Sequence, residues 1–206
     1  MADWFRNATW SNEIEEEFFR RLARARSQRD QYLVIQAITL ASLRPEITLR
    51  LVDLYFETRS ALFDDARALV AKATALVAMG DLSAAAEAYR SVLACEKARQ
   101  GLVTTAYLEY PFLVATERME SEYECALAVL EDRKSYVAFP LGRFKWNAAY
   151  AMILSARGNA NAARSYALAA VEAAREQSSE FRNHRGLGLV DGTCEPLVRR
   201  LEGLCL

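Results

Sequence analysis

Residues 71–93 read AKATALVAMGDLSAAAEAYRSVL, and residues 151–171 read AMILSARGNANAARSYALAAV. Each segment has a small residue, a glycine seven positions later and an alanine five positions after that. These residues are Ala73, Gly80 and Ala85 in the first segment, and Ala151, Gly158 and Ala163 in the second. Glycine commonly ends a helix because it adopts a positive φ at little cost. We therefore expect each segment to form a hairpin of two helices joined by a tight turn at the glycine.

The spacing of the two segments predicts more than two hairpins. Gly80 and Gly158 lie 78 positions apart, which is two units of about 39 residues. A degenerate unit fits between them, with Ser121, Tyr123, Ala126 and Leu130 at its matching positions, and a weaker one covers residues 29–58. Repetition at this period is typical of solenoids, in which each hairpin buries its apolar face on its neighbours. We expect a single all-α domain over residues 1–206, with about four hairpins over 29–177 between caps at 1–28 and 178–206.

At these residues the chain resembles the tetratricopeptide repeat family, whose hairpins pack through small residues at repeat positions eight and twenty. Ala73 with Ala85, and Ala151 with Ala163, match those positions, and Tyr89 matches the usual aromatic position. The match is good over residues 66–99 and 144–177 and weaker over 29–58 and 103–133. The resemblance implies an α-α superhelix.

The resemblance also implies where a partner binds, because the first helices of such hairpins line a concave groove for peptides or proteins. The matching positions of this chain are Arg67, Val70, Thr74, Val77, Lys145, Ala148, Met152 and Ser155. These residues suggest a non-enzymatic module that binds a protein or peptide. An alternative within the same class is a dedicated inhibitor that neutralises one toxin.

Charge and hydropathy exclude other classes of partner. The 26 Lys and Arg side chains are balanced by 27 Asp and Glu, whereas a dedicated nucleic-acid-binding protein carries an excess of cations. No apolar run reaches the roughly eighteen residues that a membrane span needs. The acidic N-terminal stretch does not resemble a signal peptide, so we expect a cytoplasmic protein. An apolar solenoid end leaves a homo-oligomer possible.

Reactive residues are sparse and scattered. The cysteines, at positions 95, 125, 194 and 205, form no Cys-x-x-Cys pair, and His184 is the single histidine, so we expect no metal, no disulfide and no cofactor. Buried thiols are the expected state, with Cys125 inside its helix. A dyad of Cys125 and His184 is the enzymatic alternative. The glycines of GLGLVDG, residues 186–192, suit a linker or C-terminal cap better than a phosphate loop.

Three local expectations concern the helix ends and the aromatic residues. Asn12 and Glu15 have the spacing of a capping box for a helix over residues 12–25. Pro111 should kink or split a helix over residues 102–118, because proline removes a backbone donor. The aromatic residues Trp4, Phe5 and Trp10 either fold back as a cap or anchor a partner.

Overall fold

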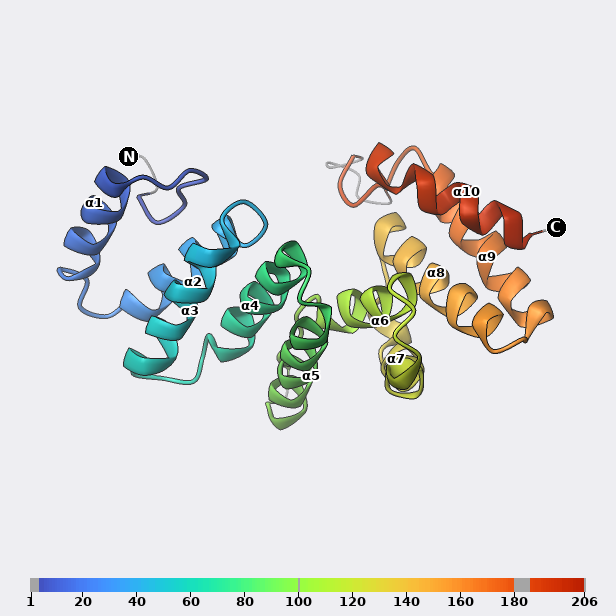
Figure 1. The fold of residues 1–206 in the computed structure, drawn as a ribbon, viewed down its shortest axis with the longest axis horizontal. Helices are drawn as coiled ribbons and strands as arrows, with labels where there is room; N and C mark the ends of the chain where they lie inside the picture. Colours follow the sequence, from blue (N-terminus) through green and yellow to red (C-terminus); the bar gives the residue numbers. More distant parts are fainter. Residues whose placement is uncertain (1–3, 100, 180–185, 206) are drawn as a thin grey trace. The chain divides into compact units, whose positions relative to one another are not determined.

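The computed structural model describes residues 4–99, 101–179 and 186–205, and the regular secondary structure of these residues is entirely helical (Figure 1). The chain divides into two compact units, Met1–Ala106 and Tyr107–Leu206. The described residues form ten α-helices: α1 Asn12–Leu22, α2 Arg29–Leu40, α3 Pro45–Thr58, α4 Asp65–Met79, α5 Leu82–Ala98, α6 Ala106–Thr116, α7 Tyr123–Asp132, α8 Pro140–Ala156, α9 Ala160–Arg175 and α10 Glu195–Leu204. Helices that are neighbours in the sequence pack in pairs, as a helical repeat requires. The prediction of one continuous domain stays a prediction.

In the first unit, α2 packs on α3 and α4 packs on α5 (Figure 1). The turn between α4 and α5 is the predicted one: Gly80 has a φ of 81°, and the Asp81 side chain caps α5 by accepting from the backbone N–H of Ala84. Ala73 and Ala85 are completely buried. Their small side chains let the two helix backbones approach closely, so the residues of the repeat have a packing role.

In the second unit, α8 and α9 form the equivalent pair, and α10 packs against both of them. Gly158 has a φ of 76°, and the Asn159 side chain accepts from the N–H of Ala162. Ala151 and Ala163 are buried, as the repeat predicts. The glycine-bearing segment before α10 caps α8, because the carbonyl oxygen of Gly188 accepts a 2.7 Å hydrogen bond from the N–H of Leu141.

A third turn of the same kind ends α6, between the two that the sequence reveals. Arg118 has a φ of 53°, and among the described residues it is the one non-glycine residue with a positive φ. The N–H of the following residue, Met119, donates to the carbonyl of Val114 at 3.0 Å. The equivalent bonds after Gly80 and Gly158 are 3.0 Å and 2.9 Å long. Arg118 lies 38 positions after Gly80 and 40 before Gly158, so the turns recur at the predicted period.

The structure corrects three local predictions. Ser11, not Asn12, caps α1, because its hydroxyl accepts from the N–H of Ile14; Glu15 instead accepts from the indole of Trp10. The helix α6 is not split at Pro111 but continues through it to Thr116. Cys125 is exposed rather than buried, because α7 turns Tyr123, Ala126 and Leu130 toward the core instead.

Candidate partner-binding surfaces

The predicted groove residues of the first unit lie along one face of α4. Val70 and Thr74 are half-buried and Val77 is exposed. The Arg67 guanidinium lies 2.9 Å from Asp64 Oδ1, and the hydroxyl of Thr74 donates to the carbonyl of Val70. This face is therefore accessible, but the Arg67 guanidinium and the Thr74 hydroxyl already have partners in α4 or at its N-cap.

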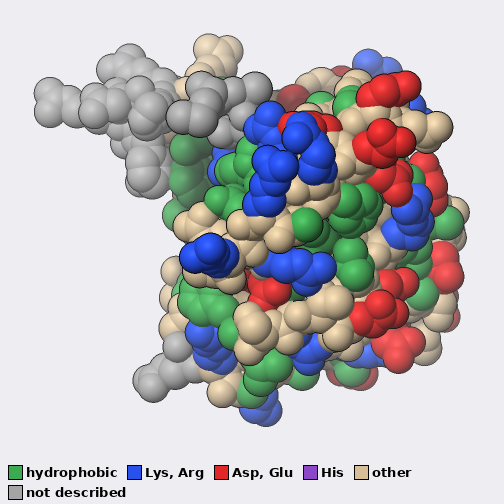
Figure 2. All heavy atoms as spheres, turned by 90° about the vertical axis from the view of Figure 1, so that its left-hand side faces the viewer, with side chains coloured by type: hydrophobic (Ala, Val, Ile, Leu, Met, Phe, Trp, Pro, Cys, Tyr) green, Lys and Arg blue, Asp and Glu red, His purple; other side chains and the backbone are tan. Residues whose placement is uncertain are grey.

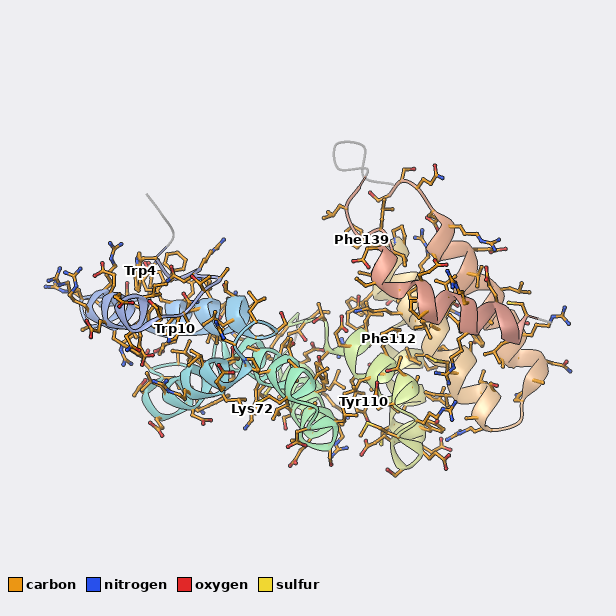
Figure 3. The ribbon with its side chains drawn as sticks, turned by 45° about the horizontal axis from the view of Figure 1, so that its top comes forward. Trp4, Trp10, Lys72, Tyr110, Phe112 and Phe139 are labelled. Carbon is orange, nitrogen blue, oxygen red and sulfur yellow. The ribbon has the colours of Figure 1, made fainter. Side chains whose placement is uncertain are left out.

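Two of the predicted groove residues on α8 are engaged inside the second unit. Lys145 Nζ lies 2.7 Å and 2.8 Å from the two carboxylate oxygens of Glu109 and 5.2 Å from the ring centre of Phe112 (labelled in Figure 3), and its side chain is 18% exposed. Ala148 has no exposed surface, so it does not line a groove. The reason is that α8 contacts α7, α9 and α10, and α6 through Lys145, which leaves little of its surface free.

The other two, Met152 and Ser155, line a concavity of about 290 Å³ within the second unit, which we call the α8–α10 pocket. Helices α6, α8 and α10 reach it with their C-terminal ends, and α7 with its first residue. Its remaining lining residues are Ala115, Arg118, Glu120, Tyr123, Ala156, Arg200 and Leu204. The pocket therefore joins apolar residues to charged side chains from the turn after α6, the short 3-10 helix before α7, and α10.

The charged groups at this pocket are two arginines and one glutamate. Arg118, Glu120 and Arg200 are exposed, and the described part of the chain offers neither guanidinium an ion pair. Arg157, in contrast, lies 2.8 Å from Glu124. Guanidinium groups bind carboxylates through paired hydrogen bonds and suit interfaces better than lysine does. The lining can thus hold an apolar side chain beside a carboxylate.

The backbone of Arg118 adds a second argument for this pocket. A left-handed conformation costs an ordinary residue about 1–2 kcal/mol, and the equivalent turns avoid that cost with Gly80 and Gly158. Strain of this kind clusters at functional sites, where a side chain is needed in spite of it. Here the strained residue, Arg118, is itself one of the residues that line the pocket.

Sequence reasoning missed Arg118 and Arg200. Arg118 carried a signal, because the midpoint between Gly80 and Gly158 is residue 119, and a turn at the predicted period belongs close to it. The turn residue is an arginine, and glycine is the residue that normally marks such a turn in a sequence. Arg200 carried no signal, since the approach of α10 to the end of α8 depends on tertiary packing.

No family model matches this chain, and the comparisons with curated proteins and with solved structures return no match. Within residues 4–99, 101–179 and 186–205, no three His, Cys, Asp or Glu side chains gather as metal ligands would, and no helix has both the length and the apolarity to cross a membrane. His184, which the enzymatic alternative pairs with Cys125, lies outside these residues.

Figure 2 shows a face on which basic side chains gather near the upper middle and acidic ones along the right edge.

Proposed function

We propose that this chain is a non-enzymatic interaction module of the cytoplasm, which binds a protein or peptide partner with a tetratricopeptide-like stack of helical hairpins. Three of the left-handed positions, Gly80, Arg118 and Gly158, share the same helix-ending hydrogen bond, and their intervals of 38 and 40 residues support the repeat. Buried alanines at the contacts of α4 with α5 and of α8 with α9 support hairpins of that kind.

The observation that carries the proposal is the α8–α10 pocket. Met152 and Ser155 are expected to face a partner from the resemblance alone, and both line this concavity together with two arginines that have no ion pair among the described residues. We infer that the partner places an apolar side chain against Met152 and Leu204 and a carboxylate near Arg118 and Arg200. Contacts of this type, an apolar anchor with a charged rim, provide most of the energy in many interfaces.

Affinity capture with a matched pair of variants tests the proposal. Ser155→Arg fills the pocket, whereas Ser165→Arg makes the same substitution on the exposed surface of α9. Wild-type and Ser165→Arg chains should enrich the same protein from native lysate, as measured by quantitative mass spectrometry. The Ser155→Arg chain should lose at least nine-tenths of it, a fraction that corresponds to about 1.4 kcal/mol. Equal enrichment by all three chains would contradict the proposed site.

A further inference from the structure

The first described residues, 4–10, lie across α1 and α2 without forming a helix, and we call them the N-terminal strap. Figure 3 labels its two tryptophans, Trp4 and Trp10, beside these helices. The strap continues directly into α1 at Ser11, which caps that helix. The core beneath it is made by side chains of the helices themselves, among them Leu22, Leu33 and Leu40.

A single buried side chain binds the main chain of the strap. Gln36 on α2 has no exposed surface, and its amide pairs with both backbone groups of Asn7. Gln36 Oε1 accepts from the N–H of Asn7 at 3.0 Å, and Gln36 Nε2 donates to the carbonyl oxygen of Asn7 at 2.8 Å. The Asn7 side chain adds a 3.2 Å bond to the same Oε1 atom and closes a turn on the Trp4 carbonyl at 2.7 Å. Recognition of backbone groups does not depend on which side chain the residue carries.

Aromatic rings fix the position of the strap on the N-terminal side of this pairing. The ring centre of Trp4 lies 5.5 Å from that of Phe18 and 4.9 Å from that of Tyr32, and Phe5 lies 4.6 Å from Tyr32. These distances are those of favourable aromatic pairs. Phe18 and Tyr32 thus form a shelf for two adjacent aromatic side chains.

This arrangement has the parts of a peptide-recognition site: a polar group that binds the peptide backbone, and apolar surfaces that select its side chains. Departure of the strap would uncover the shelf and leave the Gln36 amide without its bonds to Asn7. We propose that the surface formed by Phe18, Tyr32 and Gln36 is a peptide-docking site, which the chain's own strap occupies and guards. Its partner is a protein segment with two adjacent aromatic residues, followed two positions later by a residue whose backbone N–H and C=O are free.

The tether makes the strap a strong competitor. A short flexible connection holds a ligand at an effective concentration of the order of millimolar. A free peptide with an intrinsic Kd of about 10 µM would therefore bind the wild-type chain roughly 100-fold more weakly than a chain whose strap is released. The docking site is closed while the strap occupies it. It lies in the first unit, whereas the α8–α10 pocket belongs to the second.

The test uses the full chain with a weakened strap. Trp4→Ala combined with Phe5→Ala removes the rings that hold the strap and leaves the docking site intact. A fluorescent peptide with the sequence of residues 2–11 is the probe, and fluorescence anisotropy measures its binding. The double variant should bind this peptide at least 10-fold more tightly than wild type, whereas Thr9→Ala, at an exposed position of the strap, should leave the wild-type affinity unchanged.

A modified probe tests the role of Gln36 without any change in the protein. Methylation of the backbone nitrogen at the Asn7 position removes the donor to Gln36 Oε1, and it should weaken binding to the double variant at least 10-fold. Methylation at the Thr9 position should have little effect. Equal affinity of the double variant and wild type for the unmodified peptide, or no effect of methylation at Asn7, would overturn the proposal. Loss of cooperative folding in the double variant would overturn it too, since the strap would then be part of the core.

Hydrogen exchange of the wild-type chain provides a second measurement. A displaceable strap opens on its own, so the Asn7 N–H should exchange at least 100-fold faster than buried amides of α2, such as that of Val34. Exchange of both amides at one rate would mean that the strap opens only when the first unit unfolds, and would contradict the proposal.

Discussion

Arg118 and Gly158 end α6 and α8 in the same left-handed conformation, with φ angles of 53° and 76°. In both turns the next residue donates its N–H to a helix carbonyl five positions earlier. The left-handed position is glycine in one turn and arginine in the other, and the arginine lines the α8–α10 pocket. The turn at Arg118 therefore retains a conformation that glycine would adopt at lower cost.

Replacement of that arginine should stabilise the chain. Arg118→Gly removes the left-handed strain, and part of the gain is offset by the greater freedom of glycine in the unfolded chain. We expect the free energy of unfolding to rise by about 0.5–1 kcal/mol, as measured by urea denaturation. Gly80→Ala and Gly158→Ala should lower it by about 1 kcal/mol each, although neither added methyl group meets a neighbour within 4 Å. A loss of stability in Arg118→Gly would show that the guanidinium has an internal structural role.

The close approach of Gly188 to Phe139 predicts a larger loss of stability when Gly188 is replaced. A Cβ atom at Gly188 would lie 2.7–2.9 Å from the Phe139 side chain, and its φ of 68° already disfavours other residues. Gly188→Ala should destabilise the second unit by about 2–3 kcal/mol, the sum of backbone strain and overpacking. Gly192→Ala is the matched control, because its Cβ would meet nothing within 4 Å and its φ is not positive. Thermal unfolding of both variants checks the difference; equal melting temperatures would mean that the segment before α10 does not dock on α8.

The stability contributed by Glu15 should depend on pH. Its carboxylate accepts a 2.7 Å bond from the Trp10 indole and a 2.6 Å bond from Arg50, and these bonds hold its pKa below the ordinary value. A lowered pKa in the folded state stabilises the chain above the ordinary pKa of about 4.3, and this contribution is lost as the pH falls through the folded value. Glu15→Gln should therefore be about 0.5–1 kcal/mol less stable than wild type near pH 7, and the difference should disappear as the pH falls through the folded pKa of Glu15. A difference that persists at low pH would point to packing rather than charge.

The helices and the regular turns follow from local rules, and for that reason the sequence predicts them. Gly80 and Gly158 end helices because glycine adopts a positive φ cheaply, and Asp81 caps α5 because its oxygen reaches the N–H of Ala84. The site is less predictable. Ala148 is buried because α8 is covered by neighbouring helices, and Lys145 is paired because Glu109 of α6 lies beside it; no local pattern encodes these contacts. Gln36 reads as an ordinary helix residue, and its pairing with Asn7 depends on a contact 29 positions away in the sequence.

Binding of a protein or peptide partner at the α8–α10 pocket requires Arg118, and a titration can measure this dependence. Isothermal titration calorimetry with the purified captured partner compares wild type with Arg118→Gly, the variant that we expect to be more stable. The Arg118→Gly chain should bind at least 10-fold more weakly, about 1.4 kcal/mol, despite its higher stability. Unchanged affinity in a folded Arg118→Gly chain would contradict this dependence.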